Sequence, residues 1–318
     1  MTGPGPGRLV VAGEVLTDLV PAGGDGLFRA APGGSPANVA VGLARLEVPV
    51  RFLARLADDA FGRRLRGHLR ANGVDLSYAV RAAEPSSLAV VTLAADGSAE
   101  YDFRVDGTAD WQWTDAELEG ACDESVAGLH VGSLAMVLEP GASALSRLVA
   151  TARETATVSF DPNVRPLLMG SPEEVRPRVE ALVAVSDVVK ASSEDIEWLH
   201  PGVSPQIVAQ RWAQHGPALV AVTLGAGGVV CVGRAAGVLR RPGLAVDVAD
   251  TVGAGDSFMS ALLAGLHARG LLGAAARPAL GALDGASLSD VLDYAVRAAA
   301  VTCGRPGADP PTRDELRG

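Results

Sequence analysis

The sequence predicts an α/β protein with a mostly parallel sheet, covered by helices on both faces, and a small β lid. Apolar runs typical of strands alternate with segments of helical spacing along the 318 residues. Several of these runs are apolar throughout, as in parallel strands that are buried on both faces. Residues 14–32 and 86–108 break the alternation and consist of extended segments and turns, so we assign them to the lid.

The elements are expected in the following order. The expected strands are Leu9–Ala12, Val50–Ala54, Leu88–Leu93, Leu129–Gly132, Thr157–Asp161, Asp187–Lys190, Leu219–Thr223 and Val229–Val232. The expected helices span 36–46, 59–72, 141–155, 173–183, 205–215, 254–269 and 288–303. Asp96-Gly97-Ser98 indicates a hairpin turn between two lid strands, and the Ala/Gly/Pro-rich stretch 274–287 is expected on the surface. No linker or repeat divides the chain, which we therefore expect to form one domain over residues 8–318.

Composition and charge exclude several classes of protein. The net charge of −10 argues against nucleic acid or an anionic membrane as a partner of a broad surface. Cys122, Cys231 and Cys303 lie far apart without a CxxC pair, which favours a reducing compartment and argues against a zinc site. No apolar run reaches the roughly 18 residues of a membrane span, and residues 1–7 lack the pattern of a signal peptide. We therefore expect a cytoplasmic location.

The segment 250–256 reads Asp-Thr-Val-Gly-Ala-Gly-Asp, and apolar residues at helical spacing follow it directly. Glycines let a ligand approach backbone N–H groups closely, and a helix N-terminus favours anions. We expect the amides of Gly253, Ala254 and Gly255 to hold an anionic group. We expect Asp256 to take the proton of an attacking hydroxyl, as phosphoryl transfer to an alcohol requires. The alternative is that Asp256 only stabilises the first turn of its helix.

Two other glycine turns adjoin predicted elements. Gly33–Asn38 opens a helix, and the amide of Asn38 can both donate to and accept from sugar hydroxyls. Thr223–Gly228 lies between two strand-like runs, where the Thr223 hydroxyl and the glycine amides suit nucleotide phosphates. A flexible capped loop and a plain hairpin turn are the respective alternatives.

Two polar segments follow predicted strands, at the edge where open α/β sheets bind ligands. The segment 161–165 ends in Arg165, which suits a phosphate or a substrate carboxylate, or else is a surface residue of a β-turn. The segment 190–195 begins with Lys190, the only lysine among 27 lysine and arginine residues. A G+C-rich genome accounts for the arginines. A narrow site beside a phosphate would account for one retained lysine, because its ammonium is compact, and chance is the alternative.

Ser192, Glu194 and Asp195 follow Lys190 at the start of a helix. They either cap this helix or supply a carboxylate that holds Mg²⁺ through water. Two other phosphate-binding motifs are absent from the sequence. There is no Walker A loop, and no GxGxxG follows the first strand, which removes the best support for hydride transfer.

Taken in this order, the motifs resemble the signatures of the ribokinase-like carbohydrate kinases, the PfkB family, preceded by the family's leading segment Gly13–Asp18. The resemblance runs from about Arg8 to Leu316. It implies a three-layer α/β/α sandwich with a β lid, ATP as phosphoryl donor with Mg²⁺, K⁺ as a candidate cofactor, and a homodimer formed through the lid. It implies Asp256 as catalytic base and the amides of Gly253, Ala254 and Gly255 as the anion hole.

The resemblance also implies the remaining site residues. The substrate-binding residues would be Asp18, Gly33, Gly34, Asn38, Phe103, Arg104 and Arg165. The nucleotide-binding residues would be Lys190, Ser192, Thr223, Gly225, Gly228, Gly253, Gly255, Ala299 and Gly304. The metal would be served through water by Asp195 or Glu194. Where many members have Asn-x-x-Glu, this chain has Ser192-x-x-Asp195, so the choice between the two carboxylates stays open.

Within the family, His130-x-Gly132-Ser133 and Asp161-x-Asn163-x-Arg165 are most similar to bacterial fructokinases and 2-keto-3-deoxygluconate kinases. The expected activity is ATP-dependent phosphorylation of a hydroxyl of a small sugar, fructose first. The alternatives are a 2-keto-3-deoxygluconate kinase, a ribokinase or nucleoside kinase, and a sugar sensor without catalysis. The expected small-molecule partners are the sugar and ATP.

Overall fold

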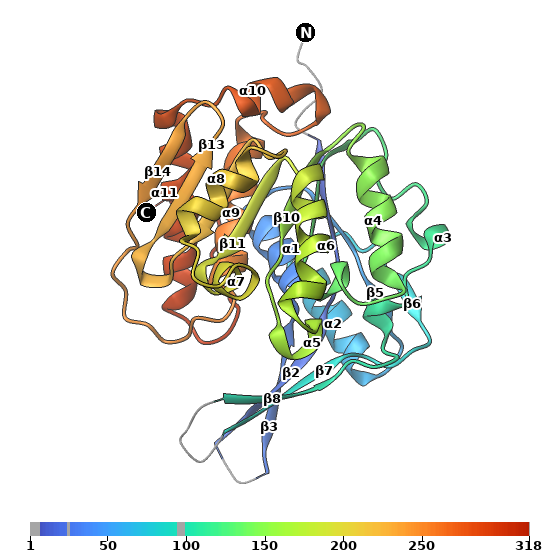
Figure 1. The fold of residues 1–318 in the computed structure, drawn as a ribbon. Coiled ribbons are helices and arrows are strands. Elements are labelled where there is room, and N and C mark those ends of the chain that lie inside the picture. Colours follow the sequence, from blue (N-terminus) through green and yellow to red (C-terminus); the bar gives the residue numbers. More distant parts are fainter. Residues whose placement is uncertain (1–6, 24–25, 94–98, 318) are drawn as a thin grey trace.

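The computed structural model describes residues 7–23, 26–93 and 99–317 (Figure 1). The hairpin turn expected at 96–98 lies outside these residues. Within the described part, one large sheet and one small sheet carry the fold, and helices cover the large sheet on both faces. The predicted fold class, a three-layer α/β/α sandwich with a β lid, is confirmed.

The large sheet has eight strands in the order β14-β13-β12-β11-β10-β9-β1-β4. The pairs from β12 to β4 are parallel, whereas β13 and β14 join antiparallel at one edge. The strands are β1 Arg8–Ala12, β4 Val50–Leu53, β9 Val126–Gly132, β10 Thr157–Asp161, β11 Val188–Ser192, β12 Leu219–Thr223, β13 Val229–Gly233 and β14 Gly237–Arg241. The carboxyl ends of the parallel strands therefore meet at one edge, where the polar motifs of the sequence follow them.

Each face of the large sheet packs on its own hydrophobic core. In β1, Leu9 and Val11 belong to one core and Val10 and Ala12 to the other, because successive side chains of a strand point to opposite faces. The first face is covered by α1 Ser35–Arg45, α2 Ala60–Ala71, α9 Ala254–Ala268, α10 Arg277–Gly281 and α11 Gly285–Cys303. The second is covered by α4 Gly141–Ala152, α6 Pro172–Val185, α7 Ser193–Leu199 and α8 Pro205–Ala213.

The small sheet projects from the body of the molecule (Figure 1). Its order is β3-β2-β7-β8, with β2 and β7 parallel and the other pairs antiparallel. Its strands are β2 Leu16–Pro21, β3 Phe28–Gly33, β7 Leu88–Leu93 and β8 Ala99–Arg104. Two three-residue strands, β5 Arg55–Ala57 and β6 Val80–Ala82, pair in parallel with each other and form a separate two-stranded sheet. β3 leads straight into α1, so the lid and the start of α1 are joined by one residue, Gly34.

The structure differs from the sequence-based expectation in several short elements, among them the four-residue helices α3 Asp115–Leu118 and α5 Pro166–Met169, which no pattern in the sequence predicts. The stretch 274–287 is not purely a surface loop, because it contains α10 and the first turn of α11, and Leu280 is 1% exposed. Since Leu280 is the buried apolar residue of α10, the segment has no repeated apolar spacing that would predict a helix. The strands β5, β6 and β14 were not expected, since the first two are too short to show a pattern and β14 is largely exposed. Among the described residues, no helix combines the length and the apolar composition needed to cross a membrane.

Candidate active site

A cavity of about 1190 Å³ opens where the carboxyl ends of the parallel strands, the lid and the N-termini of α1 and α9 meet. Its wall brings together most of the residues that the sequence predicts for the site. These are Asp18, Gly34, Asn38, Phe103, Arg165, Lys190, Ser192, Glu194, Thr223, Gly225, Gly228, Gly253, Ala254, Gly255, Asp256 and Ala299. One continuous cavity therefore joins the lid to the turn after β12 and to α11.

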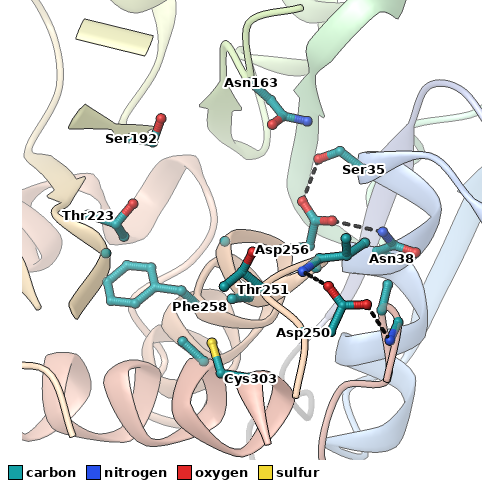
Figure 2. Close-up of a pocket in the computed structure, with 18 of the residues that line it drawn as sticks. Ser35, Asn38, Asn163, Ser192, Thr223, Asp250, Thr251, Asp256, Phe258 and Cys303 are labelled. Carbon is teal, nitrogen blue, oxygen red and sulfur yellow. Dashed lines mark hydrogen bonds between the residues drawn. The ribbon is translucent and has the colours of Figure 1, made fainter. Parts of the chain in front are cut away.

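Asp256 lies in the first turn of α9 and faces the first turn of α1 (Figure 2). Its Oδ1 accepts a hydrogen bond from Ser35 Oγ at 2.6 Å, and its Oδ2 accepts one from Asn38 Nδ2 at 2.8 Å. The carboxylate is 8% exposed and lines the cavity. Both of its oxygens are thus oriented by a neighbouring helix. The sequence did not single out Ser35 as a site residue, because a serine after two glycines at a helix start has the pattern of a simple cap.

The turn before Asp256 leaves little room for a side chain at two positions. Gly253 caps α9 with φ of 77°, and a Cβ there would lie 2.6 Å from Cβ of Ala308. A Cβ on Gly255 would lie 2.8 Å from Nζ of Lys190. Asp250 fastens the turn, since its Oδ1 accepts from the Val252 amide at 3.0 Å and its Oδ2 from the Gly307 amide at 2.8 Å. The first N–H groups of α9, which have no acceptor within the helix, are therefore held in a fixed cluster beside Asp256.

A buried ion pair lies beside this turn. Nζ of Lys190 donates to Oδ2 of Asp161 at 2.9 Å, and the two residues are 3% and 1% exposed. Burial raises the pKa of Asp161 to about 6, although Lys190 opposes this shift. Burial by itself lowers the pKa of Lys190, but the charges of Asp161, Asp195 and Asp256 outweigh it and raise the pKa of Lys190. At neutral pH the ammonium is therefore charged and lies next to Gly255, where it can face an anion.

The lid contributes Asp18 from β2 to the opposite part of the cavity. Burial raises the pKa of Asp18 to about 6, and the positive charge of Arg165 opposes the shift. A Cβ on Gly33 would lie 2.2 Å from Oδ2 of Asp18. Gly33 itself does not belong to the cavity wall, so its contribution is the room that it leaves for Asp18.

The two carboxylates considered for the metal are separated by the structure. Asp195 is buried, and its two oxygens accept from the backbone amides of Val164 and Ser192, each at 2.7 Å. It ties the loop after β10 to the capping box of α7 and is not part of the cavity wall. Glu194 is exposed and belongs to the wall. Of the two, Glu194 is thus the one on the cavity wall.

The cavity suits a Mg²⁺ ion that is held mainly by the phosphates of a nucleotide and by water. Among the described residues, no group of three or more histidine, cysteine or acidic side chains has the arrangement of a metal site. Mg²⁺ is usually held by one or two carboxylates together with water and substrate phosphates rather than by an all-protein cage. A single exposed carboxylate, Glu194, on the cavity wall is compatible with that mode.

Two further predicted residues lie away from the cavity. Arg104, at the end of β8, is exposed and forms an ion pair with Asp102 at 2.6 Å. Gly304 lines a neighbouring, shallower cavity of about 480 Å³. Conversely, the wall includes the segment 243–248 with the exposed side chains of Leu244, Val246 and Val248. Within the described part of the chain, this segment pairs with no strand of the large sheet, and because it also lacks a periodic pattern it could not be selected from the sequence.

Comparison with known proteins identifies the family of the chain. The family described as pfkB family carbohydrate kinase matches residues 8–315. Fructokinase-1 of Oryza sativa subsp. japonica is 40% identical over 271 residues, which are 81% of this chain and 83% of that protein. The crystal structure of a Xylella fastidiosa fructokinase with bound ATP superposes with a TM-score of 0.89 at 30% identity, covering 98% of this chain and 97% of that one.

A fructokinase double mutant from Vibrio cholerae O395, solved in a form with fructose, ADP and potassium ion bound, superposes with a TM-score of 0.83 at 29% identity. That match covers 99% of this chain and 98% of the other. The resemblance inferred from the sequence motifs is confirmed along nearly the whole chain, and with it the assignment to ATP-dependent sugar kinases. The chain belongs to the pfkB family of carbohydrate kinases.

Proposed function

We propose that the protein transfers the γ-phosphoryl group of ATP to a hydroxyl of fructose. The observation that carries the proposal is the position of Asp256, whose carboxylate is held by Ser35 and Asn38 beside the glycine turn and on the wall of one shared cavity. Fructose is favoured as the acceptor because the relatives described above are fructokinases, one of them solved with fructose and ADP.

The sugar is placed at the lid end of the cavity. Asp18 is the acceptor for sugar hydroxyls there, and Gly34 leaves its backbone accessible because it has no side chain. Asn38 donates its amide to Asp256, so its oxygen is the group that can meet the sugar. Phe103 adds an apolar surface from β8.

The phosphates of ATP are placed on the other side of Asp256. The amides of residues 253–255 and the ammonium of Lys190 would face the transferred group, and Thr223 and Gly225 would face the rest of the nucleotide. Asp256 accepts the proton of the attacking hydroxyl as the phosphoryl group moves in line. Mg²⁺ bound with ATP would neutralise charge on the phosphates, with Glu194 holding it through water. K⁺ is a second candidate ion, because the Vibrio structure contains potassium.

A sugar acid is the second candidate acceptor. Arg165 is on the cavity wall and close enough to Asp18 to influence its pKa, so a cation is present at the lid end. A guanidinium there would pair with the carboxylate of 2-keto-3-deoxygluconate. Arg104, which is paired with Asp102 on the exposed end of β8, is the weaker choice for that role.

We further propose a homodimer formed through the lid and a cytoplasmic location. The lid carries two large apolar side chains at the start of β3, Leu27 at 62% exposure and Phe28 at 46%. Exposed apolar side chains that adjoin one another can form part of an interaction surface. Light scattering of the wild type and of Phe28→Asp tests the dimer: a dimeric mass that the substitution halves supports it, and a monomeric wild type contradicts it. The free state of all three cysteines supports the location.

A coupled ADP-release screen tests the function. Hexoses, pentoses, keto-sugar acids and nucleosides are offered at matched concentrations with ATP and Mg²⁺, and kcat/KM is measured for each acceptor. We expect fructose to give the highest value. A keto-sugar acid in first place would favour the second candidate. Ribose or a nucleoside in first place would favour a ribokinase or nucleoside kinase. Calorimetric binding of a sugar without ADP release from any acceptor would indicate a sensor and contradict the kinase proposal.

A further inference from the structure

Glu14 is a buried carboxyl group on the cavity wall that the mechanism above does not use. It is 2% exposed, and it lies between β1 and the lid strand β2. Among the described residues, no cationic group lies within ion-pair distance of it, and the charged neighbour that acts on it is Asp110, itself 1% exposed. Burial raises the pKa of Glu14 to about 7. Burying a carboxyl group without a neighbouring cation lowers the stability of the folded state, and a functional role would account for its presence.

The hydrogen bonds of Glu14 lead into the lid end of the cavity. Its Oε2 accepts from the Ala135 amide at 3.2 Å, and the Ser133 hydroxyl is close enough to the same carboxyl group to lower its pKa. Ser133 Oγ in turn accepts from Asn163 Nδ2 at 3.4 Å. Asn163 Oδ1 accepts from Arg165 Nη1 at 3.0 Å. A relay of two side chains, Ser133 and Asn163, thus connects Glu14 to the Arg165 guanidinium, whose charge acts on Asp18.

Two members of this relay have backbone conformations that need support. Ser133 has φ of 57° and Asn163 has φ of 38°, and only Glu47 shares this property among the described residues other than glycine. They follow β9 and β10, whose ends approach so closely that a Cβ on Gly132 would lie 2.2 Å from the Asp161 carbonyl oxygen. Left-handed conformations of such residues persist only where neighbouring groups fix them, and they cluster at binding sites.

Glu14 supplies that fixation for the turn after β9. It accepts a hydrogen bond from the Ala135 amide and interacts with the Ser133 hydroxyl, and these two residues belong to one turn. The nucleotide side is remote from it, because Thr223 ends β12, which is separated from β9 by β11 and β10. A substitution at Glu14 should therefore shift the groups that face the sugar more than those that face the nucleotide.

From this arrangement we infer that Glu14 is a positioning residue for the acceptor sugar. Through Ser133 and Asn163 it fixes Arg165 and the lid end of the cavity, and it governs the affinity for the sugar without changing the affinity for ATP. The inference rests on the proposed kinase function and adds to it a group, outside the catalytic machinery described above, that determines how the acceptor is held.

The test compares four single variants and one double variant by their KM for sugar and for ATP. Glu14→Leu and Ser133→Ala are each expected to raise the sugar KM about tenfold, the effect of one lost hydrogen bond, with the ATP KM unchanged within about twofold. Glu14→Gln keeps an oxygen that can accept from Ser133 and Ala135. We therefore expect its increase in log KM for the sugar to be at most half of the increase caused by Glu14→Leu. The double variant Glu14→Leu/Ser133→Ala is expected to be no worse than either single variant, because both break the same relay.

Asp110→Asn is the matched control. Asp110 is an equally buried carboxyl next to Glu14, but it accepts from the Val15 amide and from Ser87 instead of Ser133. We expect it to leave the sugar KM within about twofold of the wild type, the experimental scatter that we allow for a residue outside the relay. The inference is overturned if Glu14→Leu raises both KM values equally, if the two substitutions are additive, or if Asp110→Asn has the same effect on the sugar KM.

The outcome is independent of two complications. If Glu14→Leu fails to fold, as judged by circular dichroism and ATP binding, then Glu14→Gln and Ser133→Ala decide together, because Ser133 itself lines the cavity. A double variant Glu14→Gln/Ser133→Ala that is no worse than Ser133→Ala supports the inference, and additive effects of the two substitutions contradict it. If the wild type prefers an acceptor other than fructose, the proposed substrate is wrong, but the ratio of variant to wild-type KM, measured with the preferred acceptor, still tests Glu14.

Discussion

Replacing Lys190 by methionine removes the cation that lies between Asp161 and the glycine turn before Asp256. Methionine has a similar length, so the substitution leaves little empty volume and mainly removes the charge. Asp161, 1% exposed, then loses the partner at 2.9 Å from its Oδ2. Breaking a buried pair on one side costs about 3–5 kcal/mol, because a buried charge is left uncompensated. We expect urea denaturation at pH 7.5 to show a loss of stability of this order.

The same substitution tests whether Lys190 faces the phosphates. Its Nζ lies 2.8 Å from where a Cβ of Gly255 would be, in contact with the proposed anion hole. Removing one charge-assisted hydrogen bond of about 1.5–3 kcal/mol predicts that the KM for ATP rises about 10- to 100-fold. Lys190→Arg should not restore it, because the wide guanidinium does not fit where the ammonium packs against the turn.

A double variant separates stability from function. Lys190→Met/Asp161→Asn removes both charges, so most of the lost stability should return, whereas the KM for ATP should stay high. ADP release with saturating fructose gives the KM values, and urea denaturation gives the free energies of unfolding. The reasoning is refuted if Lys190→Met leaves both quantities unchanged, or if Lys190→Arg has wild-type kinetics.

Three further predictions concern groups around the cavity. Because burial raises the pKa of Asp18 to about 6, its carboxylate is available to sugar hydroxyls only above that value, so kcat/KM for the sugar should fall below about pH 6; a pH profile in which Asp18→Asn retains this limb would show that another group causes it. Gly33→Ala should raise the sugar KM at least tenfold in steady-state assays, since the new Cβ would lie 2.2 Å from Oδ2 of Asp18; an unchanged KM would mean that Asp18 does not contact the sugar. Ser35→Ala removes the hydrogen bond of 2.6 Å to Asp256 and should lower kcat about tenfold while sugar binding by calorimetry stays intact; an unaltered kcat would contradict an orienting role.

The fold could be predicted from the sequence because its strands are apolar throughout and its helices have regular spacing. Leu219–Thr223 was expected as a strand and is found with the same bounds as β12. The parts that escaped prediction have few residues or no period. β5 and β6 have three residues each, and α10 has Leu280 as its only fully buried anchor. In such segments the tertiary contacts decide the local structure, and the pattern of the segment alone does not.

The site could be predicted where one motif holds several functional groups together. The turn 253–256 lies on the cavity wall as predicted, and so do Lys190, Ser192 and Glu194 of the segment 190–195, whereas Asp195 does not. What the sequence did not contain was the pairing of groups that are far apart along the chain. Ser35 meets Asp256 across 221 positions, and Asp195 is withdrawn from the cavity by the amide of Val164. Such contacts arise from the packing of α9 against α1 and of α7 against the loop after β10, which no local pattern reports.

The most direct test of the account is the turnover of Asp256→Asn with fructose and ATP. Asparagine keeps the size of the side chain and an oxygen that can accept from Ser35 or Asn38, but it cannot take a proton from the sugar hydroxyl. The account predicts that kcat falls by about 10²- to 10⁴-fold while calorimetry shows unchanged binding of ATP and fructose. Turnover at the wild-type rate would contradict the assignment of Asp256 as the catalytic base.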